Sequence, residues 1–177
     1  ELFVPDNLIG IAYFDEDIAL DKGRYMLEPL TLSKMLEAAN LDENDTVLDI
    51  GGTTGYSAAI LSPNVSTVIA LESNEDYLAA AEKHWNELDA CNIVACHGKL
   101  KDGSLDKGPY DVIIMHGAVP EVPQKIAEQL ALNGRLLTII KKPGDKIGQA
   151  TLIQHVSEGV FSSYTLFECG AEYLEGF

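Results

Sequence analysis

Short, nearly continuous apolar runs that alternate with helical patterns constrain the fold of this chain more than any other feature. The runs cover residues 46–50, 65–71, 92–96, 112–115 and 135–140. Strands of a parallel sheet have helices on both faces, so they are apolar along their whole length rather than at every second residue. The runs therefore predict a largely parallel β-sheet.

The segments between the runs have the periodicity of amphipathic helices, with apolar residues three or four positions apart. These residues are Leu32, Met35, Leu36 and Ala39; Tyr77, Ala81, Trp85 and Leu88; and Val122, Ile126 and Leu130. Pro29 suits the first position of the first helix, which we expect to end at Asn40. Ser73 is expected to cap the second helix, and Asn133-Gly134 to end the third.

Two late segments, residues 150–156 and 160–167, flank Glu158-Gly159 and predict a closing antiparallel hairpin. Repeated strand–helix–strand units followed by such a hairpin define the expected fold class. It is α/β and Rossmann-like: a doubly wound, mainly parallel seven-stranded sheet with an antiparallel C-terminal hairpin. Neither a repeat nor a linker interrupts the pattern, so we expect one domain over residues 1–177.

Composition and charge exclude several classes of partner. The formal net charge of −16 repels phosphate backbones, so we expect no nucleic-acid substrate. The sequence contains neither an apolar stretch of membrane-spanning length nor a signal-like start, so a cytoplasmic protein without membrane contact is expected. The histidines are scattered and the cysteines do not have metal-site spacing, which predicts no metal centre.

A glycine-rich turn follows the first apolar run and leads into a helix expected to begin at about Tyr56. It reads Asp49-Ile50-Gly51-Gly52-Thr53-Thr54-Gly55. Ligands of open α/β sheets bind outside the carboxyl ends of the strands, and glycines there let a ligand approach the backbone. A new helix also offers free N–H groups to an anion such as the carboxylate of a methionyl group. The turn is therefore a candidate cofactor site.

Glu72 lies at the end of the next apolar run, where a carboxylate can accept hydrogen bonds from both hydroxyls of an adenosine ribose. The dinucleotide fingerprint Gly-x-Gly-x-x-Gly is absent from the turn. The two features together favour a nucleoside cofactor and disfavour a nicotinamide oxidoreductase.

The turn resembles motif I of class I methyltransferases, usually Asp/Glu-x-Gly-x-Gly-x-Gly. The chain as far as about residue 140 resembles the protein-L-isoaspartate O-methyltransferases, which belong to that class and depend on S-adenosylmethionine. The resemblance is carried by residues 1–5, 27–29, 46–58, 108–114, 122–123 and 129–136. It implies S-adenosylmethionine as cofactor, a carboxyl group of a protein, peptide or small molecule as methyl acceptor, and helices preceding Glu1.

Carried over residue by residue, the resemblance implies a cofactor site and three departures from the family pattern. The cofactor site comprises Gly51, Thr53, Gly55, Glu72, Ser73, Gly98 and Lys99. Thr53 stands in place of the middle glycine of motif I, and a β-branched residue is strained there if the position needs positive φ. Lys99 stands where the family has an aspartate that meets the adenine amino group. The family segment Gln-Thr-Ile-Ser-x-Pro reads Arg24-Tyr25-Met26-Leu27-Glu28-Pro29 here, so Leu27 replaces a serine tied to catalysis.

Two functions remain open at this point. The first is an S-adenosylmethionine-dependent O-methyltransferase that methylates a carboxyl group, with Tyr25 and His116 as candidate catalytic residues. A carboxylate acceptor is already ionised near neutral pH, so no strong general base is needed. The second is a catalytically degenerate methyltransferase fold that serves as a binding or interaction protein. Glu72 and the glycines favour the first function, and the three departures favour the second.

Overall fold

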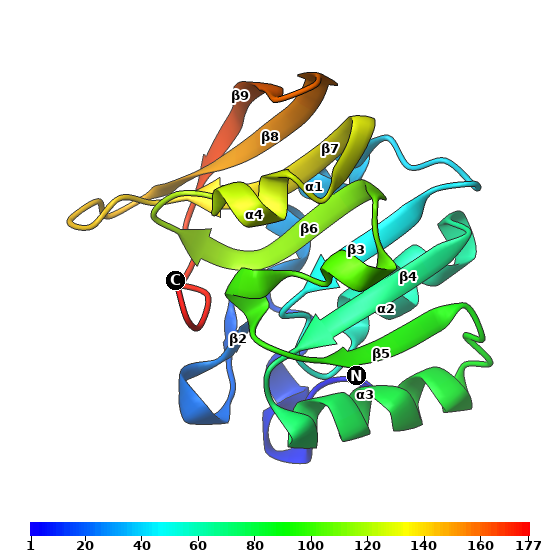
Figure 1. Cartoon of the computed structure of the whole chain (residues 1–177). Helices are drawn as coiled ribbons and strands as arrows, with labels where there is room; N and C mark the ends of the chain where they lie inside the picture. Colours follow the sequence, from blue (N-terminus) through cyan, green and yellow to red (C-terminus); the bar gives the residue numbers. More distant parts are fainter.

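The computed structural model describes residues 1–177, except for the side chain of Lys22. Its centre is a seven-stranded sheet in the order β5-β4-β3-β6-β7-β8-β9 (Figure 1). The strands are β3 (Thr46–Ile50), β4 (Thr67–Glu72), β5 (Ile93–His97), β6 (Tyr110–Val119), β7 (Leu130–Ile140), β8 (Gly148–Ser157) and β9 (Val160–Cys169). Strands β3 to β7 pair in parallel, and β8 and β9 are antiparallel to their neighbours. The predicted fold class is confirmed.

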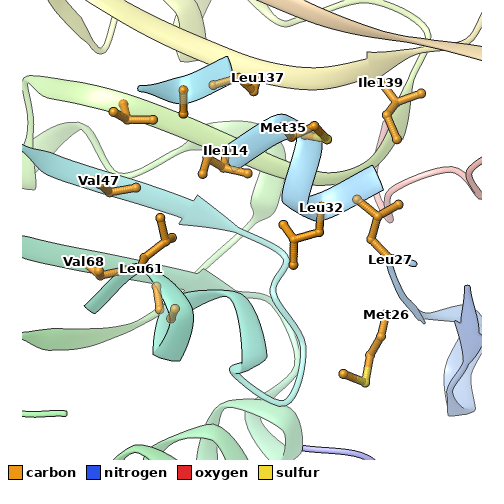
Figure 2. Close-up of a cluster of buried hydrophobic side chains, with 14 of the residues drawn as sticks. Met26, Leu27, Leu32, Met35, Val47, Leu61, Val68, Ile114, Leu137 and Ile139 are labelled. Atoms are coloured by element: carbon orange, nitrogen blue, oxygen red, sulfur yellow. The ribbon is translucent and has the colours of Figure 1, made fainter. Parts of the chain in front are cut away.

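Helices cover the two faces of this sheet. They are α1 (Pro29–Ala39), α2 (Tyr56–Leu61), α3 (Glu75–Glu87) and α4 (Gln124–Ala127), with 3-10 turns η1 (Asp6–Ile11), η2 (Asp21–Gly23), η3 (Ser62–Asn64), η4 (Leu100–Asp102) and η5 (Leu105–Lys107). One core contains buried residues of α1, α2 and α3, and the other contains Ile126 of α4 and Leu174 near the C-terminus. Figure 2 shows part of the first core, where Met35 of α1 lies close to Ile114 of β6.

The central strands are buried on both faces, as their continuous apolar runs predicted. Val47 belongs to the first core and Leu48, the next residue along the strand, belongs to the second. Both side chains are fully buried. Each residue pair of this kind removes apolar surface from water on two sides, which stabilises the sheet by roughly 1.5–3 kcal/mol per large side chain.

The third predicted helix is shorter than the sequence pattern suggests. Helix α4 ends at Ala127, and Leu130 already pairs with Tyr110 in the sheet. Asn133-Gly134 lies inside β7 at a register shift, with φ +67° at Asn133. A Cβ on Gly134 would lie 2.8 Å from the carbonyl oxygen of Ala131. The predicted helix end was wrong because a strand bulge and a helix terminus use the same left-handed residue types.

The other two helices follow their patterns closely. Helix α1 begins at Pro29 and is followed by Asn40 in the left-handed conformation, as predicted. In α3 the cap is Asn74 rather than Ser73, because the Asn74 side chain accepts hydrogen bonds from the N–H groups of Asp76 and Tyr77. Leu88, predicted to share the buried face of α3, lies beyond the last helical residue and is 51% exposed.

Segments from both ends of the chain contact the carboxyl ends of the central strands: the hydroxyl of Thr54, after β3, donates to the carbonyl oxygen of Phe3. A separate two-stranded sheet pairs β1 (Ile18–Ala19) with β2 (Tyr25–Met26). The C-terminal segment pairs with the end of β6 through a bridge between Ala118 and Tyr173. Figure 1 shows β2 and the C-terminus beside the arrowheads of the central strands. None of the helices described in the structure is long and apolar enough to cross a membrane.

Candidate functional site

The glycine turn after β3 has the left-handed backbone that its sequence suggested. The φ angles are +78° at Gly51, +52° at Thr53 and +92° at Gly55, and α2 begins at Tyr56. Thr53 is therefore a β-branched residue in a region that L-residues with branched side chains avoid, at a cost of about 1–3 kcal/mol. Its N–H donates to Oε2 of Glu72 over 3.1 Å. This bond ties the strained residue to the end of the neighbouring strand.

Glu72 ends β4 with a buried side chain, 3% exposed. Its Oε1 accepts from the backbone N–H groups of Ser73 at 2.7 Å and of Asn74 at 3.0 Å. The structure thus brings Glu72, Ser73 and the glycine turn together, as the sequence predicted. The N–H of Gly98, after β5, donates to the carbonyl oxygen of Glu72 at 3.0 Å, and the neighbouring Lys99 is exposed.

Arg24 completes this cluster, and sequence reasoning missed its partner. Its Nη1 donates to Oε1 of Glu72 over 2.6 Å and its Nη2 to Oε2 over 2.8 Å, a two-pronged ion pair. Nη2 also donates to the carbonyl oxygen of Gly51 at 3.2 Å. Both charged side chains are 3% exposed. The two residues are 48 positions apart, and no local pattern in the sequence connects them.

Gly55 occupies the side of the turn that faces α3. Its carbonyl oxygen accepts from Nε1 of Trp85 over 2.8 Å. A Cβ at this glycine would lie 2.6 Å from the same nitrogen. The absence of a side chain at Gly55 therefore lets α3 pack against the turn.

A second polar cluster lies at the other side of the turn, where β3 meets β6. Asp49 of β3 is buried, with one carboxylate oxygen hydrogen-bonded to Nε2 of His116 on β6. The other oxygen accepts from the hydroxyl of Ser57 over 2.7 Å. His116 and Tyr25, the two candidate catalytic residues, line one cavity of about 20 Å³ beside the glycine turn. The parallel pairing of β3 with β6 brings Asp49 and His116 together, which sequence reasoning did not predict.

The C-terminal segment covers this edge of the sheet. The N–H of Leu174 donates to the carbonyl oxygen of Ala118 on β6 over 2.8 Å. The side chain of Leu174 packs on the bare Cα of Gly51, where a Cβ would lie 2.7 Å from it. Among the side chains described in the structure, no group of three His, Cys, Asp or Glu residues has metal-binding geometry.

The geometry of this edge can be compared with known proteins. The family model described as Protein-L-isoaspartate(D-aspartate) O-methyltransferase (PCMT) matches residues 1–169 of the chain. The chain belongs to this family. Its fold is that of the class I S-adenosylmethionine-dependent methyltransferases, as the sequence predicted.

Individual relatives agree with the family match. The Protein-L-isoaspartate O-methyltransferase of Koribacter versatilis is 34% identical over 143 residues, which cover 81% of this chain and 64% of the relative. A solved protein-L-isoaspartate O-methyltransferase superposes with a TM-score of 0.80 at 25% identity, covering 90% of this chain and 52% of the other. A Plasmodium falciparum protein of the same description, solved with S-adenosyl-L-homocysteine, superposes with a TM-score of 0.77 at 19% identity, covering 98% and 84%. The chain therefore spans just under two thirds of the Koribacter relative's length.

The three departures from the PCMT pattern have distinct surroundings. Leu27 is buried in the first core, so an apolar side chain packs where the family pattern has a hydroxyl. Thr53 takes the positive φ that the motif's glycine would adopt freely. Lys99 is exposed after β5, and its ammonium is a hydrogen-bond donor only.

Proposed function

We propose that residues 1–177 form one domain that acts as an S-adenosylmethionine-dependent O-methyltransferase. Its acceptor is the carboxylate of isoaspartyl residues in proteins or peptides, and it works in the cytoplasm. The observation that carries the proposal is the position of Glu72. Its carboxylate lies at the end of β4, directly beside the left-handed glycine turn, in a chain whose family match covers residues 1–169.

The donors and acceptors around the turn fit an adenosyl group. Glu72 supplies acceptors for the ribose hydroxyls, and Gly51 and Thr53 present backbone to the methionyl part. Gly98 and Lys99 lie beyond β4 on the adenine side, where the backbone must accept from the adenine amino group because the Lys99 side chain cannot. For a nucleoside to enter, Arg24 must leave Glu72 and Leu174 must leave Gly51, since both now occupy this space.

The order of the strands supports an acceptor site on the other side of the turn from Glu72. Strand β3 lies between β4, which carries Glu72, and β6, which carries His116. A cofactor with its ribose at Glu72 and its methionyl part along the glycine turn would be held across the ends of β4 and β3, next to β6. When bound, S-adenosylmethionine supplies an activated methyl group there. His116 and Tyr25 line the adjoining cavity and are the groups that meet the acceptor.

The residues of this chain contribute position rather than proton transfer. A carboxylate acceptor is ionised near neutral pH, so attack on the methyl group needs no strong base. Holding two reactants in line contributes about 7–11 kcal/mol to such a reaction. Asp49 fixes the imidazole of His116, and Ser57 in turn fixes Asp49. His116 is thereby held in one orientation toward an incoming carboxylate.

An isoaspartyl peptide and its matched normal aspartyl peptide test this proposal. With labelled S-adenosylmethionine, we expect methyl ester on the isoaspartyl peptide and none on the aspartyl control. Turnover should be slow, because Leu27 offers no hydroxyl. The Leu27→Ser variant should accelerate it. Equal labelling of both peptides, or of neither, would contradict the proposed acceptor.

A second candidate function is a methyltransferase fold that binds partners without catalysis. The observation that favours it is the closed site: Arg24 and Glu72 are paired, and the cavity beside the glycine turn measures only about 20 Å³. Small-molecule sites are typically about 300–1,000 Å³. Calorimetry with S-adenosylhomocysteine separates the two functions, since an enzyme must bind it at micromolar concentrations and a degenerate fold need not.

A further inference from the structure

We propose that Arg24 is a latch on the nucleoside site: its guanidinium competes directly with the cofactor for Glu72 and so sets cofactor affinity. The inference rests on the proposed function, because Glu72 must be the carboxylate that meets the ribose. The proposed function already requires Arg24 to leave Glu72; the new claim is that this competition sets the affinity for the cofactor.

The hydrogen bonds at Glu72 leave no acceptor for a ribose while Arg24 is in place. An ionised carboxylate offers about four acceptor positions. Its two oxygens already accept from both prongs of Arg24 and from the N–H groups of Thr53, Ser73 and Asn74. A ribose hydroxyl can therefore bond to this carboxylate only after Arg24 withdraws.

The cavities around the Arg24–Glu72 pair are also too small for a ribose while Arg24 is in place. The cavity between Glu72 and the turn is about 10 Å³, and the one beside Arg24 and Leu174 is also about 10 Å³. Each has room for about one water molecule. An adenosyl group enters only if Arg24 and the segments next to it move together.

The segment that carries Arg24 is suited to such a movement. Residues 18–26 form a two-stranded sheet of their own, which is not paired with the central sheet. On its outer side Tyr77 of α3 hydrogen-bonds to Asp21, and the guanidinium of Arg24 lies 5.9 Å from the centre of the Tyr77 ring. The segment is thus joined to the rest of the protein through side chains, including Ile18 and Met26 in the first core, so it can move without breaking backbone pairing in the main sheet.

Arg24 also has an exit at the surface. Its Nη1 lies 3.2 Å from Oε2 of Glu175, whose side chain is 56% exposed, and 3.3 Å from the hydroxyl of Ser73. When the latch opens, Glu175 keeps a counter-charge next to the guanidinium as it moves into solvent. The closed state is favoured because the pair at Glu72 is buried and two-pronged, a geometry that arginine makes and lysine does not.

A ligand that binds only the open state has its apparent affinity reduced by the fraction of molecules that are open. Arg24→Gln removes the charge and the two-pronged ion pair with Glu72 while keeping a polar side chain. It should tighten the binding of S-adenosylhomocysteine by about tenfold or more. Arg24→Lys keeps the charge but cannot make the two-pronged pair, so its affinity for S-adenosylhomocysteine should lie between those of the wild type and Arg24→Gln. Arg135→Gln is the matched control: it removes another two-pronged arginine ion pair, with Asp45, and should leave the affinity unchanged.

The three variants and the wild type are titrated with S-adenosylhomocysteine by calorimetry, after circular dichroism has confirmed that each is folded. The order Arg24→Gln tighter than Arg24→Lys tighter than wild type supports the latch. Unchanged or weaker binding by Arg24→Gln, with measurable binding by the wild type, overturns the latch and leaves the proposed function standing. Absence of binding by every protein at millimolar ligand overturns the proposed function itself, and the latch with it.

Hydrogen exchange on the wild-type chain gives a second readout that needs no variant. Saturating S-adenosylhomocysteine should increase the exchange of amides in residues 18–26 while slowing exchange in residues 51–55. Slower exchange in both segments would show that the ligand closes over Arg24, which would overturn the latch.

Discussion

The two ends of the central sheet each hold an arginine paired with a carboxylate, Arg24 fully buried and Arg135 partly buried, and the pairs are built differently. At the carboxyl ends of the strands, Arg24 bonds mainly to side chains, those of Glu72, Ser73 and Glu175. At the amino ends, Arg135 bonds to Asp45 and also to the backbone carbonyl oxygens of Ala39, Asn40 and Asp111. One pair joins the small β1–β2 sheet to the end of β4, whereas the other joins the end of α1 to β6 and β7.

The bonding partners of Arg24 and Arg135 explain why two similar ion pairs have different roles. Carbonyl oxygens at a helix end need donors whatever else the protein does, so Arg135 is bound to permanent partners. Arg24 bonds to a carboxylate that a ligand hydroxyl can also use. We therefore expect changes at the Arg24 end to affect ligand binding as well as stability, and changes at the Arg135 end to affect stability alone.

The largest expected effect is at Glu72. Glu72→Gln should weaken binding of S-adenosylhomocysteine by about a hundredfold, because the amide N–H₂ faces donors. It should also lower the free energy of unfolding by about 3 kcal/mol, because Arg24 loses its buried counter-charge and keeps only the exposed Glu175. Calorimetry and urea unfolding measure the two effects. Asp45→Asn is the control at the other end and should change only the stability. Normal binding by Glu72→Gln would remove Glu72 from the nucleoside site.

Arg135→Gln breaks the other pair. It should lower the free energy of unfolding by about 2 kcal/mol, because partly buried Asp45 and the carbonyl oxygens of α1 lose their donor. Urea unfolding followed by the fluorescence of Trp85 measures this change. Isoaspartyl turnover by the folded variant should match the wild type at saturating substrate. If turnover fell by more than the loss of folded protein explains, Arg135 would also affect the active site, and the proposed difference between the two ends would be wrong.

His116 and Glu72 both lie at the carboxyl ends of the strands, but we expect them to serve different ligands. His116→Asn keeps a donor for Asp49 but removes the imidazole from the cavity, so kcat for the isoaspartyl peptide should fall by about tenfold or more. The affinity for S-adenosylhomocysteine should change by less than about twofold, since Glu72 lies on the other side of the turn. Steady-state kinetics and calorimetry on the same preparation separate the two quantities. Equal losses in both would assign His116 to the cofactor rather than to the acceptor.

The smallest expected effects are opposite pH dependences of two aspartates. Burial raises the pKa of Asp17, near Arg24, above its ordinary value, although the N–H of Glu28 partly offsets this. A raised carboxyl pKa destabilises the fold above that pKa, and the destabilisation disappears as the pH falls through it. Asp17→Asn should therefore stabilise the protein slightly at neutral pH, within about 1 kcal/mol, and less in acid.

Asp42, at the Arg135 end, should behave in the opposite way. Hydrogen bonds from the backbone and side chain of Asn44 lower its pKa. A lowered carboxyl pKa stabilises the fold at neutral pH, and that contribution is lost as the pH falls through the folded-state value. Asp42→Asn should therefore destabilise slightly at neutral pH and not in acid. Thermal unfolding of Asp17→Asn and Asp42→Asn between neutral pH and about pH 3 measures the two trends. A change of stability with pH in the same direction for both variants would contradict the opposite pKa shifts of the two aspartates.

The sequence by itself determined the architecture and the position of the candidate site. Continuous apolar runs imply a buried parallel sheet, and a glycine-rich turn followed by an acid at the next strand end implies a ligand there, because both signals depend on neighbouring residues only. The turn at residues 51–55 and the helix at residues 29–39 were predicted for this reason. The end of the third helix was wrong because a left-handed Asn-Gly pair fits both a helix end and a bulge.

Only the tertiary structure decided which charged groups meet. Arg24 finds Glu72 across 48 positions, and His116 finds Asp49 across 67. Such pairs depend on strand order and register, whereas periodicity describes each segment alone. A chain with 28 acidic residues offers an arginine many partners, and the packing of two distant segments against one sheet edge selects one of them.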